Sequence, residues 1–320
     1  MDRVLVIEEL EPFIEEEVRL LGIEVEDTSR RNRVGELSVD AVRKAFIDPD
    51  MEFREQLPSV PRPPALCPGC PHTGIFWVLN RLKATVSGDI GCYTLGAFPP
   101  FNAMDTTIEM GASVGMAFGL EKAQGREKSK KTVAVIGDST FIHSGITGLI
   151  DIVYNKGHTN VIIMDNRVTA MTGHQDNPAT GKTAKGEPTK ALDFEKLARA
   201  IGIEHVETVD PHDLKVTKRA IQRALETPEP TVIIAKRPCT LLPEERKKAA
   251  EKEPLWVNPQ ECKGEKCRVC LTLGCPAIGW KDGRAVIDPL LCVSCNLCMK
   301  LCPYNAIKEK ASSMEVSFEK

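Results

Sequence analysis

The segment Thr132-Val-Ala-Val-Ile-Gly137-Asp138-Ser139 decides the fold of this 320-residue chain. Two similar runs follow it, Asn160-Val-Ile-Ile-Met-Asp-Asn166 and Thr231-Val-Ile-Ile-Ala-Lys-Arg237. Continuous β-branched runs are typical of strands buried on both faces of a parallel sheet. Helices are expected at 106–124, 144–156, 193–201 and 211–226. The pattern predicts a doubly wound α/β domain over residues 67–240.

The flanking segments divide the rest of the chain. Residues 1–47 are interpreted as the end of a preceding α/β domain, with strands at 4–7 and 23–25 and a helix beginning near Pro12. Five prolines indicate a linker over 48–66, and charged residues indicate another over 241–258. Residues 259–320 are predicted to form a small cysteine-rich α+β module.

The composition sets the cellular context. A net charge of −3 gives no reason to expect a nucleic-acid partner, and no apolar run reaches the ~18–20 residues that span a bilayer. The first residues lead directly into a strand-like run without a signal-peptide pattern. We therefore expect a soluble chain in the reducing cytoplasm, where clustered cysteines are metal ligands more often than disulfides.

The twelve cysteines fall into three sets of four. The run Cys292-x2-Cys295-x2-Cys298-x3-Cys302-Pro303 matches the bacterial ferredoxin pattern, and a looser run precedes it at Cys262, Cys267, Cys270 and Cys275. In that pattern the fourth cysteine of a run binds the other cluster. One [4Fe–4S] cluster is thus assigned to Cys262, Cys267, Cys270 and Cys302, and the second to Cys275, Cys292, Cys295 and Cys298. Tetrahedral zinc is the alternative ligand for such thiolates.

A second site is predicted at the ends of two strands. Gly137-Asp138-Ser139 ends one strand and Asp165-Asn166 ends the next, with 26 residues between Asp138 and Asp165. The Asp138 carboxylate and the Asn166 amide oxygen are hard ligands suited to Mg²⁺. Ligands bind open α/β sheets at the carboxyl ends of strands, and the following helix start, near Ser144, favours an anion. The pattern therefore predicts a Mg²⁺–diphosphate site.

This pair of motifs resembles the thiamin-diphosphate signature, with Ser139 in place of the commoner Gly and Asp165 in place of the first Asn. In that family the backbone carbonyl two residues after the Asn, here that of Val168, is a further Mg²⁺ ligand. The proposed ligands Asp138 and Asn166 are both retained.

The chain as a whole resembles the 2-oxoacid:ferredoxin oxidoreductases, and within them the C-terminal half of the indolepyruvate ferredoxin oxidoreductase alpha subunits. The resemblance spans nearly all 320 residues. Its motifs are Cys67-Pro-Gly-Cys-Pro-His72, Gly88-Asp-Ile-Gly-Cys92-Tyr93, Asp105-Thr-Thr-Ile-Glu-Met-Gly-Ala-Ser113 and Gly137-Asp-Ser-Thr-Phe-Ile-His-Ser-Gly145, with the two ferredoxin-like runs.

The resemblance implies oxidative decarboxylation of an arylpyruvate to its acyl-CoA, with thiamin diphosphate, Mg²⁺, coenzyme A and external ferredoxin. It implies a third [4Fe–4S] cluster beside the thiamin ring, held by Cys67, Cys70, Cys92 and Cys239. The contacts to thiamin diphosphate are assigned to Gly91, Cys92, Tyr93, Met110, Gly111, Ser113, Gly137, Asp138, Ser139, Asn166, Val168 and Thr172.

His72 and His143 are the histidines within these motifs and are candidates for orienting the diphosphate or moving a proton. His174, with Thr172, is a candidate for facing the substrate. For His143, an ordinary residue at a helix start is an equal alternative, and His72 has the alternative of supporting the cysteine turn. Cys92 and Cys239 have the alternative of small buried core residues.

Thiamin enzymes activate the cofactor through a glutamate on a separate pyrimidine-binding domain, and residues 1–66 are too few to form one. We therefore expect partner subunits that carry the pyrimidine domain and a gamma-type domain. Three alternatives remain open: the same chemistry on pyruvate or branched-chain oxoacids, an electron-transfer subunit with a non-catalytic thiamin domain, and a zinc-stabilised binding protein.

Overall fold

The computed structural model describes residues 4–26, 35–53 and 63–309 of the chain. They belong to two compact units, Met1–Pro63 and Pro64–Lys320, and each unit is described by itself. Within the described ranges, none of the helices combines the length and apolar character needed to span a lipid bilayer.

The first unit contains helices α1 (Phe13–Leu20) and α2 (Val39–Phe46). The helix predicted near Pro12 is confirmed, with Glu15 and Glu16 in its first turn. The strands predicted at 4–7 and 23–25 are wrong, because both segments are irregular in the structure. They share one backbone hydrogen bond, from Glu26 N to Val4 O at 2.9 Å. A strand needs a ladder of such bonds, and the described part of this unit supplies no partner for one.

The second unit is built on a six-stranded, all-parallel sheet in the order β2-β1-β3-β4-β6-β5. The strands are β1 (Thr85–Gly88), β2 (Thr106–Thr107), β3 (Thr132–Gly137), β4 (Asn160–Asp165), β5 (His205–Val209) and β6 (Thr231–Lys236). Every residue of β3 and β4 is buried, as their continuous apolar runs predict. The three strands predicted from these runs are confirmed.

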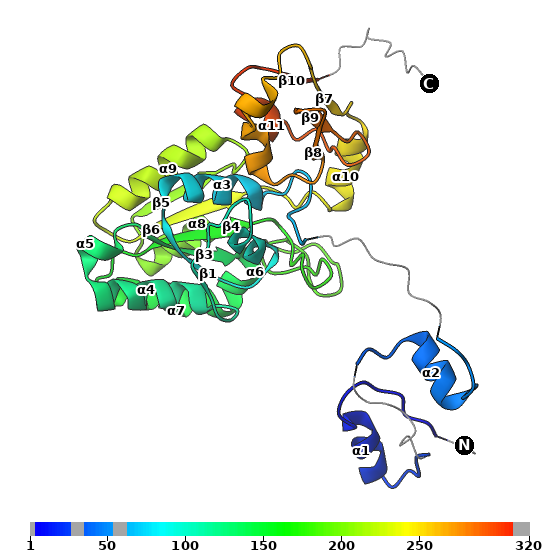
Figure 1. The fold of residues 1–320 in the computed structure, drawn as a ribbon. Coiled ribbons are helices and arrows are strands. Elements are labelled where there is room, and N and C mark those ends of the chain that lie inside the picture. Colours follow the sequence, from blue (N-terminus) through cyan, green and yellow to red (C-terminus); the bar gives the residue numbers. More distant parts are fainter. Residues whose placement is uncertain (1–3, 27–34, 54–62, 310–320) are drawn as a thin grey trace. The chain divides into compact units, whose positions relative to one another are not determined.

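Helices cover both faces of the sheet, which confirms the doubly wound α/β class (Figure 1). On one face, α3 (His72–Leu82) and α9 (Leu214–Glu226) pack with Val133 and Val135 of β3. On the other, α4 (Ala112–Gln124), α7 (Ile146–Tyr154) and α8 (Phe194–Ile201) pack with Ala134 and Ile136. Alternate β3 side chains thus enter two separate cores, because successive strand residues point to opposite faces.

Two helices begin six residues away from their predicted start. The helix expected over 106–124 begins at Ala112, because Thr106 and Thr107 form the edge strand β2. The helix expected from residue 144 instead begins at Asp138, immediately after β3, as α6 (Asp138–Thr140). A π-turn over Phe141–Gly145 joins α6 to α7. The positive end of this helix is therefore at Asp138, closer to the predicted metal ligands than Ser144 is.

The cysteine-rich module packs around a small core that includes Leu255, Leu273, Leu297, Cys298 and Ile307. Its sheets are the antiparallel pairs β7–β10 (Leu255–Val257 with Ile307–Glu309) and β8–β9 (Ile278–Lys281 with Arg284–Ile287). The remaining elements are α11 (Leu297–Leu301) and the 3₁₀ turns Gly264–Lys266 and Val269–Leu273. The predicted α+β character is confirmed.

The segment 241–258, expected to be a linker, is structured. It contains α10 (Pro243–Ala250), which begins with Pro and two acidic residues, and the strand β7. The charged composition therefore reflects an exposed helix with no buried residue. Since β7 pairs with β10, the module in the structure begins at about Leu255.

Candidate functional site

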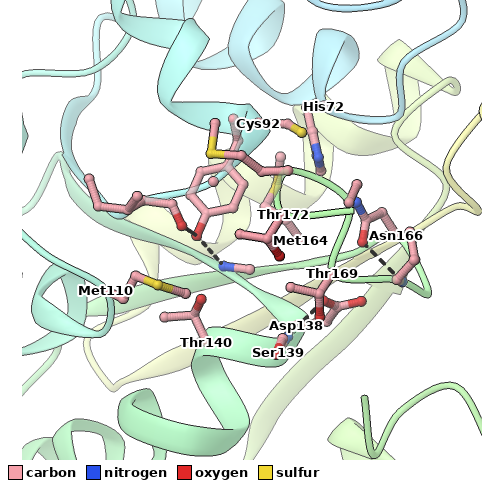
Figure 2. Close-up of a pocket in the computed structure, with 17 residues that line it drawn as sticks. His72, Cys92, Met110, Asp138, Ser139, Thr140, Met164, Asn166, Thr169 and Thr172 are labelled. Atoms are coloured by element: carbon pink, nitrogen blue, oxygen red, sulfur yellow. Dashed lines mark hydrogen bonds between the residues drawn. The ribbon is translucent and has the colours of Figure 1, made fainter. Parts of the chain in front are cut away.

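A cavity lies at the carboxyl ends of β1, β3 and β4, where the chain leaves the sheet (Figure 2). Asp138 and Ser139 lie on one side of it, and His72 and Cys92 on the opposite side (Figure 2). Eleven of its lining residues are among those predicted, namely His72, Gly91, Cys92, Tyr93, Met110, Gly137, Asp138, Ser139, Asn166, Val168 and Thr172. The carboxyl ends of these strands thus bring together motifs from separate parts of the sequence.

Three polar groups converge at the predicted metal position. The side-chain amide of Asn166 lies 2.6 Å from the carbonyl oxygen of Val168 and 3.2 Å from Oδ2 of Asp138, and its nitrogen donates a hydrogen bond to each when it faces them. Rotation of the amide would present its oxygen to a cation instead. Which way an amide points is an assignment. The donor set itself, a carboxylate, an amide oxygen and a carbonyl, is the set that Mg²⁺ prefers.

The raised pKa of the Asp138 carboxyl also favours a bound cation. Burial, together with the nearby Asp165, raises the pKa of the Asp138 carboxyl to about 7, against hydrogen bonds such as that from Ser139 N. A carboxylate in this position is costly without a positive partner. The residues present therefore fit a divalent cation.

Tyr93 ties the cavity wall together. Its hydroxyl accepts a hydrogen bond from Gly137 N at 2.9 Å and donates one to the carbonyl of Ile90 at 3.0 Å. A Cβ added to Gly137 would lie 2.9 Å from the Tyr93 ring, so only glycine fits there. Burial is the main reason that the pKa of this phenol is raised above its ordinary value. The hydroxyl therefore stays neutral and joins the β1 and β3 ends.

Gly111 and Ser113 do not line the cavity. Their backbone N–H groups donate to the carboxylate of Asp89, from Gly111 at 2.9 Å and from Ser113 at 3.2 Å. Asp89 is fully buried and occupies the positive end of α4. This role was not predicted from the sequence, although an acid directly after β1 is a signal for it. Met110, next to them in the chain, does line the cavity.

The two candidate histidines occupy different environments. His72 is buried beside Tyr93, with their ring centroids 5.6 Å apart, and burial lowers its pKa to about 4. It is therefore neutral at physiological pH. His143 is exposed, lies outside the cavity lining and has Nδ1 2.6 Å from Oγ of Ser144. His174 is also exposed and outside the lining.

Several cavity residues were not predicted from the sequence: Ile90, Thr140, Met164, Thr169, Ala170 and Met171. Asn177 also reaches the metal position, since its Nδ2 lies 3.4 Å from both Oδ1 of Asp138 and Oγ1 of Thr169. It belongs to the irregular segment after β4, so no periodic pattern in the sequence marked it.

The four dispersed cysteines, Cys67, Cys70, Cys92 and Cys239, come together near the carboxyl ends of the strands. Burial raises the pKa of the Cys70 thiol, and Cys67, Cys239 and Cys92 raise it further through electrostatic interaction. Burial also raises the pKa of Cys92, with contributions from Cys239 and Cys67. Cys239 is brought here because its N–H donates to the carbonyl of Asn166 at 2.9 Å. Buried thiolates in such a group need positive ligands such as iron.

The eight C-terminal cysteines interact in the two groups expected from the ferredoxin pattern. Burial raises the pKa of Cys270 to about 11, with contributions from Cys262, Cys302 and Cys267. The pKa of Cys298 is raised by burial and then by Cys295, Cys275 and Cys292. Cys262, the least regular position of the first run, thus lies with its predicted partners.

Among the described residues, no group of three or more His, Cys, Asp or Glu side chains is arranged to hold a single metal ion. A four-iron cluster is a body of eight atoms, so its four thiolates stand farther apart than the ligands of one ion. The cysteine groups are therefore compatible with four-iron clusters, although none of them is arranged to hold a single ion among the described residues.

Comparison with known proteins gives two family matches. Residues 89–235 match the family described as "Thiamine pyrophosphate enzyme, C-terminal TPP binding domain". Residues 285–308 match the "4Fe-4S binding domain" family, a range that contains the second cysteine run.

The curated relatives are longer proteins. The indolepyruvate oxidoreductase subunit IorA of Pyrococcus horikoshii is 39% identical over 97% of this chain and 53% of that protein. The subunit of the same name from Archaeoglobus fulgidus is 37% identical over 98% of this chain and 53% of that protein. The chain thus spans about half the length of the curated relatives it matches. Among solved structures, a 2-oxoglutarate:ferredoxin oxidoreductase from Magnetococcus marinus gives a TM-score of 0.48 at 19% identity, covering 56% of this chain and 66% of that one.

Proposed function

Because this chain belongs to the 2-oxoacid:ferredoxin oxidoreductase family, we propose that it works as a subunit of an indolepyruvate ferredoxin oxidoreductase. The proposed reaction converts an arylpyruvate and coenzyme A to the acyl-CoA and CO₂, with two electrons passed to ferredoxin. Thiamin diphosphate supplies a carbon nucleophile and an electron sink for decarboxylation. This chain supplies the diphosphate site and the thiolates.

One observation carries the proposal: Cys92 lines the cavity and also belongs to the dispersed cysteine group. A redox group held by these thiolates would adjoin the place where the substrate is oxidised. A thiamin site without a redox role would need no such neighbour, and an isolated electron carrier would need no buried Asp138.

The roles of the residues follow from their positions. Asp138, Asn166 and the Val168 carbonyl are proposed to hold Mg²⁺, and Gly137 and Ser139 to lie against the diphosphate. Neutral His72, beside Tyr93 and Cys92, is placed to accept or donate a hydrogen bond within the cavity. His143 is exposed outside the lining, which favours its alternative as an ordinary residue near a helix start.

We further propose three [4Fe–4S] clusters, one for each cysteine group. The pyrimidine-binding glutamate is assigned to a partner subunit, together with a gamma-type domain, in the reducing cytoplasm. The described part of the unit Met1–Pro63 contains two helices, which are too few to form a pyrimidine-binding domain.

The decisive experiment is anaerobic co-expression with the candidate partner subunits, followed by iron, sulfide, zinc and thiamin analysis. Coenzyme A-dependent reduction of a viologen dye is then measured with indolepyruvate, phenylpyruvate, pyruvate and a branched-chain oxoacid. The expected outcome is about twelve iron atoms per chain and preference for the aryl substrates. A preference for pyruvate would reassign the substrate, and zinc in place of iron would refute the proposal.

A further inference from the structure

The two cysteine groups of the module differ in what surrounds them. The inner group, Cys275, Cys292, Cys295 and Cys298, borders the Cys67–Cys70 turn. A Cβ added to Gly69 of that turn would lie 2.5 Å from Cγ2 of Val293 and 3.4 Å from Cβ of Cys295. The backbone N–H of Gly69 also interacts with the Cys275 thiol. The inner group therefore adjoins the dispersed group.

The outer group, Cys262, Cys267, Cys270 and Cys302, lines a separate hollow on the module. Its rim is formed by Lys263, Arg268, Trp280 and Tyr304, among others. The β8–β9 hairpin closes one side, since a Cβ on Gly264 would collide with the carbonyl of Gly283. Lys281 and Arg284 flank that hairpin turn and are exposed. Of the two cysteine groups in the module, the outer group is thus the one farther from the cavity.

The acidic side chains of this rim are mostly neutralised. Glu261 pairs with Lys308 at 2.7 Å. Glu265 pairs with Arg268 and accepts a hydrogen bond from Nε1 of Trp280 at 3.2 Å. Asp282, in the hairpin turn, is the remaining acid of residues 261–268 and 281–284.

Four exposed cations, one that lines the hollow and three that neighbour lining residues in the sequence, make no ion pair with any residue in the described part of the chain. These residues, here called the basic rim, are Lys263, Lys266, Lys281 and Arg284. Lys263 lies over the exposed ring of Tyr304, with Nζ 5.8 Å from its centroid. Together with Arg268, they outnumber the three acids of residues 261–268 and 281–284 by two, whereas the whole chain carries −3.

We propose that the outer group is the exit for electrons and that the basic rim docks the acceptor, a small acidic iron–sulfur protein. The inference rests on the proposed function and adds to it the docking surface. Exposed, unpaired charges of one sign steer an oppositely charged partner and make the encounter sensitive to salt. Each encounter transfers one electron from the outer cluster to the acceptor's oxidised cluster, and no bond forms or breaks. Short-lived redox encounters of this kind need only a small interface.

The test uses the assembled holoenzyme with a double charge reversal, Lys263→Glu with Lys266→Glu. The matched control is Lys128→Glu with Lys131→Glu, two exposed lysines in the segment that directly precedes β3 on the thiamin domain. Rates are measured with an acidic ferredoxin and with a small viologen dye, which needs no docking surface. Midpoint potentials of the clusters are followed by redox titration with electron paramagnetic resonance.

The rim variant should raise KM for ferredoxin about tenfold or more and lose most of its salt dependence, as expected for exposed docking charges. Its rate with the dye and its cluster potentials should match those of the control. An unchanged KM for ferredoxin would overturn the proposal. So would equal losses with dye and ferredoxin together with a shifted potential, since the cations would then tune the cluster.

Failure of the proposed function has a different signature, namely no oxoacid-dependent dye reduction by the unmodified enzyme. In that case, binding of ferredoxin is measured directly by calorimetry at low and high salt. Weakened binding in the rim variant alone would support docking, and equal binding by both variants would overturn it.

Discussion

The side-chain amide of Asn166 lies 3.2 Å from Oδ2 of Asp138, although each residue comes from the end of a different strand. At this distance the amide nitrogen can donate a hydrogen bond to the carboxylate. The carbonyl of Val168, 2.6 Å from the same amide atom, completes a set of three groups. If the amide turns its oxygen toward the other two groups, the three oxygens form the donor set proposed to hold Mg²⁺.

Replacement of Asp138 tests this site. Asp138→Asn keeps the shape but removes the charge, so the affinity for Mg²⁺–thiamin diphosphate should fall by about 100-fold or more. Calorimetry measures the affinity, and the iron content should not change. The control is Asp193→Asn, an exposed residue that caps α8. Equal affinities in Asp138→Asn and the unmodified protein would contradict the assignment.

Metal binding should also depend on pH. Because the pKa of Asp138 is raised from 3.8 to about 7, the metal-free folded protein keeps a proton that the unfolded chain has lost. Its stability should therefore fall as the pH rises from about 4 to 7. Mg²⁺ must displace this proton, so affinity should rise about tenfold per pH unit and level off above pH 7. Calorimetry from pH 5.5 to 8 checks this, and a pH profile that is the same in Asp138→Asn would refute it.

The Tyr93 hydroxyl should contribute to stability. Tyr93→Phe leaves the buried N–H of Gly137 and the carbonyl of Ile90 without this partner. The free energy of unfolding should fall by about 1–3 kcal/mol, the cost of an unsatisfied buried group. Denaturation in urea measures it. Tyr154→Phe is the control, because Tyr154 is 83% exposed and should show no change.

The dispersed cysteines are tested by Cys239→Ser. If Cys239 is a cluster ligand, iron should fall from about twelve to about eight atoms per chain, since one four-iron cluster is lost. Cys295→Ser should cause a similar loss but remove a different paramagnetic signal. Thr240→Ala is the neighbouring control. Unaltered iron in Cys239→Ser would show that this residue packs in the core without binding a cluster.

The contact between the Cys67–Cys70 turn and the module is tested at Gly69. Gly69→Ala places a methyl group 2.5 Å from Val293 at a backbone φ of +71°. Gly186→Ala is a matched control, because its φ is +81° and nothing lies within 4 Å of the added carbon. Both variants should pay about 1 kcal/mol for the left-handed backbone. Only Gly69→Ala should also slow electron transfer between clusters, followed by rapid-freeze spectroscopy, and equal rates would contradict this contact.

Much of the fold follows from local sequence. The unbroken β-branched runs of β3, β4 and β6 indicate buried parallel strands, because their short length and β-branched residues favour a strand over a buried helix. Fixed spacing identifies the ferredoxin-like runs, since neighbouring thiolates must wrap one cluster. The predicted strands in residues 4–7 and 23–25 failed because an apolar run forms a strand only where another strand can pair with it.

The site required the tertiary structure. Cys67 and Cys239 are 172 positions apart in the sequence, and no local rule joins them. They meet because Cys239 follows β6, which lies beside β4, and the carboxyl ends of both strands are on the same side of the sheet. Likewise, the Asp89 carboxylate takes the N–H groups of Gly111 and Ser113, which the sequence assigned to the cofactor. The sequence by itself determined which chemical groups this protein carries. The order of its parallel strands decided which of these groups meet. In that order, the carboxyl ends of strands that are distant in the chain lie side by side.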